Sequence, residues 1–228
     1  MNKVELYSDG IGFVEYVNHM GDDLTIVNSA RVSFNRHKDV MDDKDVKLVK
    51  YLIKNQHTST LEHCVVTFRI KVPLFVRSQH HRHRTWSYNE ISRRYTAEDL
   101  TFYEIASFRT QHISNRQASN DDSINPVLYP DLSNSDYGIR ANAVIAEHHA
   151  ASLRLYNNLI RTGVCREQAR GVLPQNLYTE YYATCNLNNL IKFINLRDHG
   201  HAQQEIRDLA IGMKKIAASL WPTVFADI

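Results

Sequence analysis

A strict alternation of apolar and polar residues over 65–72 is the clearest hydrophobic pattern along the chain. Its apolar members are Val66, Phe68, Ile70 and Val72. Successive side chains of a strand point to opposite faces of a sheet, so this period of two predicts a half-buried strand. Residues 11–19 and 177–185 are rich in aromatic and β-branched residues and are also predicted to be strands.

Two further segments follow helical spacing and have recognisable start signals. After a turn at 21–23, Asp23 is the predicted N-cap of a helix. The apolar positions of this helix are Leu24, Val27, Ala30 and Phe34. Pro73 is predicted to open a helix over 73–83, because a proline lacks the N–H that the first helical turn leaves unpaired.

More helices are predicted over 44–56, 139–162 and 165–172, and two helices close the chain. The last of them has a strong apolar face made by Ala202, Ile206, Leu209, Met213, Ile216 and Leu220. Residues 114–138 are rich in Ser, Asn and Asp and contain two prolines, so we expect a long, mobile surface excursion there.

These elements predict the fold class and the domain organisation. No internal repeat, low-complexity tract or linker divides the 228 residues, so we expect one domain over 1–228. Several helices with a few strands that do not alternate regularly with them favour an α+β fold. We expect a mostly antiparallel sheet with flanking helices.

Composition excludes several classes of protein. Hydrophobic residues make up 43% of the chain and charged residues 23%, which is typical of a globular protein rather than a disordered one. No apolar run reaches the roughly 20 residues that span a membrane, and no signal peptide is recognisable. The three cysteines, Cys64, Cys165 and Cys185, have no CxxC spacing. We therefore expect reduced thiols in a cytoplasmic protein, with Cys64 and Cys185 in the core.

Positive charge is concentrated in residues 77–94, which carry five arginines against one glutamate, a net +4. The whole chain has a net charge of only +2. Clustered guanidinium groups repel one another, so we expect an anionic ligand in this segment. Three histidines, His80, His81 and His83, lie in it as well. Neighbouring side chains on a helix diverge by about 100°, so these three are not expected to bind one metal ion, and we predict no metal site.

The segment RHRTWSYNEISRRY, residues 82–95, contains the most specific chemistry. Its arginines suit phosphates, while Asn89 and Glu90 suit the hydroxyl and ring edges of a nucleotide. Two alternatives remain open: a surface lattice of ion pairs, and a nucleic-acid-binding module. A surface that follows phosphates gains nothing from a central carboxylate, so Glu90 argues against nucleic acid as a partner.

The same segment carries a resemblance to a known family. The order RHR, two residues, S, one residue, NE, one residue, S, one residue, RY matches every fixed position in the signature of the flavin-dependent thymidylate synthases. Further similar blocks are SARVSF (29–34), HTSTLEH (57–63), the stretch 169–178 and NLRDHGHAQQEIR (195–207). The chain therefore resembles this family along nearly its whole length.

The resemblance implies an activity and a set of cofactors. Members convert dUMP to dTMP with the methylene group of 5,10-methylenetetrahydrofolate and a hydride from FADH2, which NADPH regenerates. They are homotetramers of a compact α+β subunit, and each active site is shared between subunits. A flavoprotein that only oxidises NADPH is the remaining alternative.

The resemblance also assigns residues. Those expected to contact dUMP are Gln79, His80, His81, Arg82, Glu90, Ile91, Ser92, Arg93, Arg94, Arg170 and Arg197. Those expected to line the FAD site are Ser59, Arg82, His83, Arg84, Glu90, Asn186, Leu187, Asn188 and Lys192. His57 is expected near the flavin ring and the folate or nicotinamide.

Arg197 is the predicted catalytic residue. Uracil C5 becomes a stronger nucleophile when negative charge builds on the ring, and a guanidinium stabilises that charge without losing its own proton. No cysteine nucleophile is then needed. His199 and His201 either cap a helix junction or position Arg197.

Several other aromatic side chains are expected to have structural rather than catalytic roles. Trp86, Tyr88 and Tyr95 are expected to serve packing or a subunit interface rather than stacking on a base. His148 and His149, in the long predicted helix, are expected to be solvated or at an interface.

Overall fold

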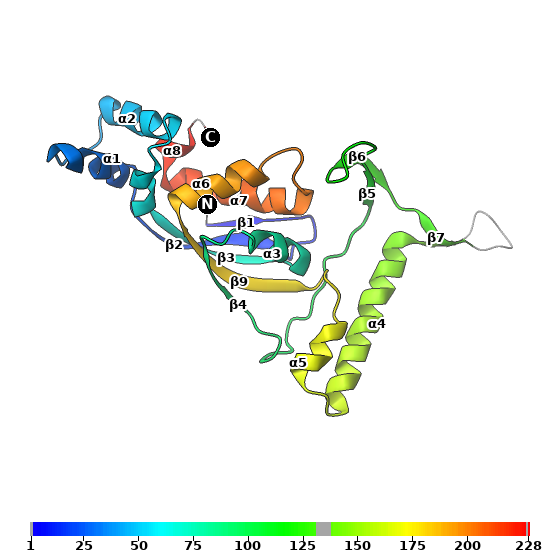
Figure 1. Cartoon of the computed structure of the whole chain (residues 1–228). Coiled ribbons are helices and arrows are strands. Elements are labelled where there is room, and N and C mark those ends of the chain that lie inside the picture. Colours follow the sequence, from blue (N-terminus) through cyan, green and yellow to red (C-terminus); the bar gives the residue numbers. More distant parts are fainter. Residues whose placement is uncertain (1, 131–137, 227) are drawn as a thin grey trace. The chain divides into compact units, whose positions relative to one another are not determined.

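The computed structural model describes residues 2–130, 138–226 and 228. The chain forms two compact units. The first unit comprises Met1–Lys71, Gln79–Asn89 and Glu180–Ile228. The second unit comprises Val72–Ser78 and Glu90–Thr179. Mixed helices and mainly antiparallel strands confirm the predicted α+β class (Figure 1).

A five-stranded sheet has the strand order β1-β2-β3-β9-β4. Its strands are β1 (Lys3–Glu5), β2 (Phe13–Met20), β3 (Val65–Pro73), β4 (Ser87–Glu90) and β9 (Tyr178–Asn186). Strand β2 pairs antiparallel with β1 and with β3, and Val14 lies opposite Ile70. The alternation in β3 is confirmed, since Val66, Phe68, Ile70 and Val72 are all fully buried.

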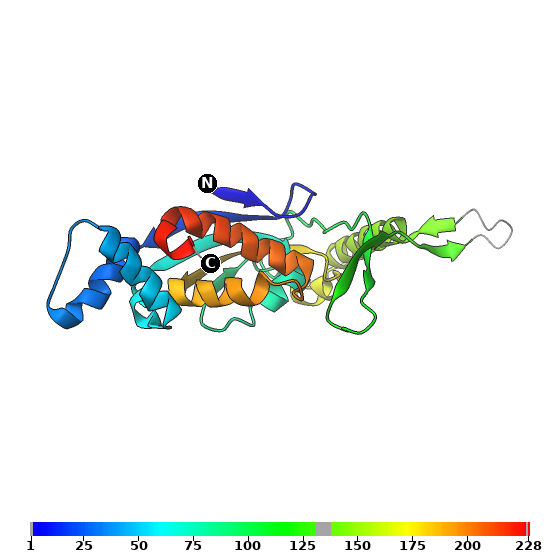
Figure 2. The same cartoon turned by 90° about the horizontal axis from the view of Figure 1, so that it is seen from above.

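In the first unit, helices α6 (Leu187–Arg197) and α7 (Gln204–Leu220) lie side by side on one face of the sheet (Figures 1 and 2). The predicted inner face of α7 is confirmed at Ile206, Leu209, Met213 and Ile216, which are buried, whereas Ala202 precedes the helix. Helix α7 packs closely against β2 at Gly212. A Cβ atom added to this glycine would lie only 2.7 Å from Cγ1 of Val14. Burial of this apolar face supplies most of the stability of such a helix.

The remaining helices of the first unit follow the early part of the chain and its end. They are α1 (Asp23–Arg31), the 3-10 helix η1 (Val32–Phe34), α2 (Asp43–Lys54), the 3-10 helix η2 (Thr58–His63) and α8 (Pro222–Phe225). The predicted N-cap Asp23 is wrong by one residue. Asp22 caps α1 by accepting from the Thr25 backbone N–H at 2.8 Å, and the buried Asp23 accepts from the Thr223 backbone N–H instead.

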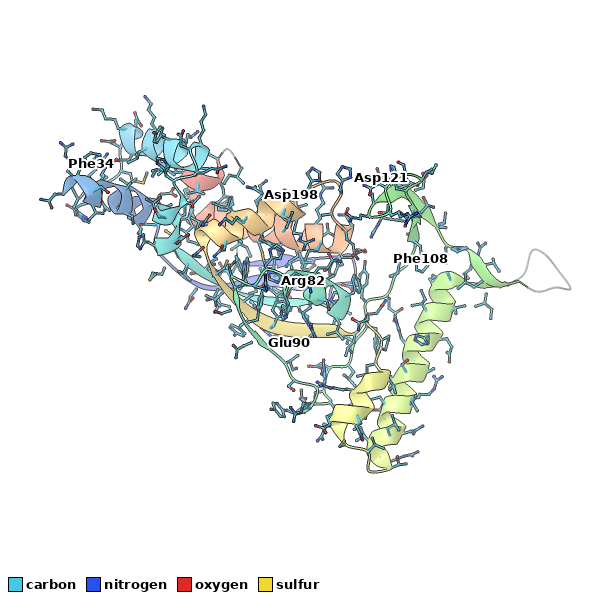
Figure 3. The ribbon with its side chains drawn as sticks, in the orientation of Figure 1. Phe34, Arg82, Glu90, Phe108, Asp121 and Asp198 are labelled. Carbon is cyan, nitrogen blue, oxygen red and sulfur yellow. The ribbon has the colours of Figure 1, made fainter. Side chains whose placement is uncertain are left out.

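The predicted place of Phe34 on the apolar face of the first helix is wrong. Helix α1 ends at Arg31, and Phe34 is 77% exposed at the end of η1 (Figure 3). A 3-10 helix has three residues per turn rather than 3.6, so the apolar spacing of α1 does not continue into η1.

The second unit contains most of α3 (Leu74–His80), then α4 (Ala141–Arg161), α5 (Arg166–Ala169) and the 3-10 helix η3 (Arg170–Val172). Two separate antiparallel pairs join β5 (Phe108–Gln111) to β6 (Ser119–Ile124) and β7 (Val127–Pro130) to β8 (Gly138–Arg140). The predicted excursion 114–138 therefore contains strands, and its residues 131–137 lie outside the described part.

Pro73 does not open the helix that was predicted over 73–83. It is the last residue of β3, and α3 ends at His80. His81 and His83 consequently follow the helix. The helical angle therefore does not explain why these histidines would not share a metal. Among the described residues no cluster of three His, Cys, Asp or Glu side chains is arranged to hold one.

No helix in residues 2–130, 138–226 and 228 is both long and apolar enough to cross a membrane. The cysteines are free thiols, with Cys64 and Cys185 buried as predicted and Cys165 exposed.

Candidate active site

A cleft of about 540 Å³ lies within the second unit. It is lined by Leu74, Arg77, Glu90, Ile91, Ser92, Arg93, Glu167, Arg170, Gly171, Leu173, Gln175, Leu177 and Thr179. Three arginines and two glutamates make this lining strongly charged. The cleft brings together, from distant parts of the sequence, residues that the resemblance assigns to dUMP, namely Glu90, Ile91, Ser92, Arg93 and Arg170.

Glu90 is a carboxylate of the cleft that accepts side-chain hydrogen bonds. It is the last residue of β4 (Figure 3), and its Oε1 accepts two hydrogen bonds. The Arg77 Nε donates at 3.1 Å and the buried Thr179 Oγ1 donates at 2.6 Å. Arg77 is one of the five arginines of the basic segment 77–94, but no sequence motif assigns it a role. Thr179 belongs to no motif that would mark it as a site residue.

Arg93 is also in the cleft, but its hydrogen bonds go to the main chain. The guanidinium donates to the carbonyl oxygens of Glu98, Asp99 and Tyr178. Burial lowers the pKa of Arg93, although a guanidinium stays charged in proteins. Arg93 therefore ties the loop after β4 to the first residue of β9.

Arg170 and Arg94 are the arginines best placed to receive an anion in this unit. Arg170 is exposed, and no carboxylate among the described residues pairs with it. The Arg94 Nη2 lies 3.6 Å from Glu167 Oε2, and both side chains are more than half exposed. Exposed ion pairs of this kind are weak, so an incoming phosphate can displace Glu167 from Arg94.

The predicted catalytic residue, Arg197, lies in the first unit at the end of α6. Its Nε donates to Nε2 of His83 at 3.2 Å. The pKa of His83 is lowered by burial and by the neighbouring Arg197 charge, which keeps the imidazole neutral and able to accept. Burial also lowers the pKa of Arg197. The hydrogen bond to His83 thus orients the Arg197 guanidinium.

His80 is a core residue of the first unit. It is fully buried, and its Nδ1 lies 2.8 Å from the Tyr181 hydroxyl. Its ring packs against Trp86 and Phe193 at centroid distances of 4.7 and 4.8 Å. Burial holds the pKa of His80 well below its ordinary value, so the ring is neutral. Its predicted contact with dUMP would have to be made through the backbone or the unpaired Nε2.

Tyr88 continues this aromatic cluster. Its hydroxyl donates to the carbonyl oxygens of His80 and His83, each at 3.0 Å, and burial raises its pKa. Trp86 is 7% exposed and packs as predicted, whereas Tyr95 is 79% exposed. His81 belongs to the same cluster, because its ring lies 4.1 Å from that of Tyr88. Gln79 is in the same unit, and its side-chain amide donates to Gln203.

A second hollow, of about 990 Å³, lies wholly within the first unit. It holds both residues that the resemblance assigns to this part of the chain, His57 and Ser59. Tyr51 also lines it and meets the His57 ring edge-on at 5.8 Å. The hollow therefore combines an exposed histidine with an aromatic wall formed by Tyr51 and Phe34.

Of the nine residues expected at the FAD site, Ser59 lies in this hollow, Glu90 lines the cleft of the second unit and His83 accepts from Arg197. The other six form two groups. Arg82, Arg84 and Lys192 are exposed, and none of them pairs with a carboxylate in the described part of the chain. Asn186, Leu187 and Asn188 have structural roles at the start of α6. The Asn186 side chain caps the helix, Leu187 is fully buried, and the Asn188 amide donates to Glu62 Oε1 at 2.9 Å.

One expectation outside the site is wrong. His149 was expected to be solvated or at an interface, but it is 3% exposed in the second unit. Its Nδ1 lies 2.8 Å from Glu104 Oε1, and its ring stacks on Phe102 at 4.8 Å. The neighbouring His148 is exposed as expected.

Comparison with known proteins gives consistent matches. A family model described as thymidylate synthase complementing protein matches residues 15–223. A protein of Thermotoga neapolitana named flavin-dependent thymidylate synthase is 40% identical over 94% of this chain and 89% of its own length. A protein of the same name from Thermus thermophilus is 39% identical, over 94% of this chain and 74% of its own.

Solved structures match over the whole fold. A UMP/dUMP methylase, PolB, from Streptomyces cacaoi bound with 5-Br dUMP has a TM-score of 0.79 and 30% identity, over 98% of this chain and 96% of that chain. The same methylase with 5-Br UMP gives a TM-score of 0.77 at 29% identity.

Proposed function

Because this chain belongs to the family of thymidylate synthase complementing proteins, with relatives named flavin-dependent thymidylate synthases, we propose that it converts dUMP to dTMP. The one-carbon donor in this proposal is 5,10-methylenetetrahydrofolate, and NADPH is the reductant. FAD, when bound, supplies the hydride that reduces the transferred methylene group.

The cleft of the second unit is the observation that carries this proposal. A nucleoside monophosphate needs cations for its phosphate and a few polar groups for its sugar and base. The lining offers Arg170, with which no carboxylate of the described residues pairs, for the phosphate. It also offers the fixed carboxylate of Glu90 for a hydroxyl or ring N–H. Its volume, about 540 Å³, suits a ligand of that size.

Arg197 acts electrostatically in the proposed reaction. Its Nε bond to neutral His83 fixes the guanidinium, and no described residue bonds to its two terminal nitrogens. These nitrogens stabilise the negative charge that develops on the uracil ring as C5 becomes nucleophilic. A guanidinium keeps its proton at neutral pH, so Arg197 does not act as a general base.

The cysteines support a reaction without a thiol nucleophile. Burial raises the pKa of Cys64 to about 12 and that of Cys185 well above its ordinary value. A thiol attacks as its thiolate, so neither group is reactive near neutral pH. Cys165 is exposed but does not line the cleft.

The residues of the first unit fit a flavin nucleotide. Arg82, Arg84 and Lys192 offer exposed charges that suit a pyrophosphate, and the hollow at His57 and Ser59 has an aromatic wall that suits a planar ring. We assign His57 to the flavin and folate side and the start of α6, from Asn186 to Asn188, to the FAD site.

The organisation of the protein is part of the same proposal. The family model spans residues of both units, which supports a single functional domain. We further propose a cytoplasmic homotetramer in which more than one chain contributes residues to each active site.

Three measurements test the function. The purified protein is loaded with FAD and its absorption spectrum is recorded before and after NADPH is added without oxygen. dTMP is then measured from dUMP and methylenetetrahydrofolate. Flavin binding, bleaching and dTMP are expected; bleaching without dTMP would indicate an NADPH oxidase, and absence of flavin binding would overturn the proposal.

A further inference from the structure

The cleft contains an arginine, Arg77, to which neither the resemblance nor the proposed function gives a role. We propose that Arg77 is a positioning residue that fixes the Glu90 carboxylate for a donor group of the bound nucleotide. This inference rests on the proposed function, because it takes the cleft to be the nucleotide site.

The backbone places Arg77 firmly beside the cleft. Helix α3 begins at Leu74, and its first N–H groups donate to the segment that lines the cleft. The Leu74 N–H donates to the Leu177 carbonyl at 3.0 Å, and the Phe75 N–H to the Gln175 carbonyl at 3.3 Å. These bonds satisfy helix-start donors and fix α3, and with it Arg77, against residues 175–177.

Glu90 is bound in an asymmetric way. Arg77 and Thr179 both donate to Oε1, while Oε2 accepts no hydrogen bond from any residue in the described part of the chain. A carboxylate has about four acceptor positions, so two donors on one oxygen fix its orientation and leave the other oxygen available. Oε2 is therefore the acceptor that a hydroxyl or ring N–H of a nucleotide can use.

The charge of Arg77 matters as much as its geometry. The Arg77 and Glu90 side chains are 30% and 24% exposed, so their pair is only partly screened by solvent. An unpaired Glu90 would repel the phosphate of an incoming nucleotide. Paired with Arg77, it presents an oriented acceptor with little excess negative charge, and Arg170 remains available for the phosphate.

The alternative is that Arg77 binds the nucleotide directly. In that case its contribution to affinity would not depend on Glu90. A double-mutant cycle separates the two roles, because residues that act through one another give non-additive effects.

The experiment measures the dissociation constant of dUMP by calorimetry on the full-length, FAD-loaded protein. The variants are Arg77→Ala, Arg77→Lys, Glu90→Ala and the double variant Arg77→Ala with Glu90→Ala. Arg154→Ala is the matched control, because it removes a charge from an exposed pair elsewhere in the second unit. Flavin spectra and melting temperatures confirm that each variant is folded.

Arg77→Ala is expected to weaken dUMP binding about tenfold, the scale of one charged hydrogen bond. The same change in the Glu90→Ala background is expected to have less than a twofold effect. Arg77→Lys keeps the charge but not the fixed Nε donor, so we expect an intermediate loss. The control should bind as the unchanged protein does.

Equal effects of Arg77→Ala in both backgrounds would overturn the inference and make Arg77 a direct ligand. An unchanged affinity in Arg77→Ala would also overturn it. If Arg77→Ala does not fold, Arg77→Lys alone tests the inference. Unchanged dUMP affinity in Arg77→Lys would exclude a role for the oriented Arg77 Nε. Failure of the unchanged protein to bind dUMP would instead refute the proposed function.

Discussion

The bond between His83 and Arg197 gives a sharp test of the proposed chemistry. His83→Ala removes the His83 Nε2 atom, which accepts a hydrogen bond from Arg197 Nε at a donor–acceptor distance of 3.2 Å. A hydrogen bond to a charged group contributes about 1.5–3 kcal/mol, and partial exposure of Arg197 reduces this to about 1–2 kcal/mol. If the bond orients Arg197 for the transition state, kcat should fall about 5- to 30-fold.

The assay is steady-state dTMP formation at saturating dUMP, which gives kcat. Because His83 is also an expected FAD contact, rates are compared at equal flavin occupancy, measured from the absorption spectrum. His83→Gln retains an acceptor oxygen and should recover part of the rate. His148→Ala, at an exposed histidine of the second unit, is the control. A kcat within twofold of the unchanged protein in His83→Ala would refute the role of this bond.

The same pair predicts a pH dependence. Burial and the Arg197 charge hold the pKa of His83 below its ordinary value of 6.5 in the folded protein. The unfolded chain therefore takes up this proton first, and stability falls as the pH drops from 6.5 toward the folded-state pKa. Above 6.5 the histidine makes no pH-dependent contribution. In the folded protein His83 is protonated only around its lowered pKa, and the protonated ring cannot accept from Arg197, so activity should fall at this lower pH. His83→Gln should lose this acid decrease in activity.

Three other changes have defined outcomes. Gly212→Ala places a Cβ atom 2.7 Å from Val14 Cγ1, so overpacking should outweigh the gain in helix propensity and lower unfolding stability by about 1 kcal/mol in chemical denaturation. Replacing all three cysteines by serine should leave dTMP formation measurable, because no thiol is proposed to attack the substrate. Arg170→Ala should raise the Kd for dUMP about 10- to 100-fold through loss of a phosphate contact, without loss of FAD.

Each of these has an opposite result that counts against it. Unchanged or increased stability in Gly212→Ala would mean that the cost of overpacking against β2 does not exceed the gain in helix propensity. A folded, flavin-loaded cysteine-free protein without any dTMP formation would point to a thiol nucleophile. If Arg170→Ala weakened deoxyuridine as much as dUMP, Arg170 would not be the phosphate ligand.

The sequence predicted the regular parts of the fold well. The alternation in β3 and the inner face of α7 depend on burial patterns that extend over several turns or residue pairs, so one local irregularity does not obscure them. The element boundaries were less predictable. Asp22 and Asp23 are adjacent carboxylates, and only the backbone angles decide which of them caps α1. Pro73 suits the end of β3 as well as the start of a helix.

The signature names residues of the candidate site but not the contacts that they make. The signature named Glu90 and Arg93, yet their partners are Arg77, Thr179 and carbonyl groups from elsewhere in the chain. Such partners depend on the tertiary arrangement, which no local spacing encodes. His149 illustrates the same limit, because its burial follows from Phe102 and Glu104, more than forty residues earlier.

The way in which Arg93 holds the loop after β4 has an evolutionary consequence. Its acceptors among the described residues are carbonyl oxygens, which every amino acid possesses. Replacement of the Glu98 side chain should therefore be tolerated, and Asp99 is restricted only by its left-handed backbone (φ 52°), which Asn or Gly also adopts. An insertion between Tyr95 and Glu98 would displace the acceptors and release the guanidinium. The amino acids of the loop from Tyr95 to Asp99 can therefore change during evolution more easily than the length of the loop can.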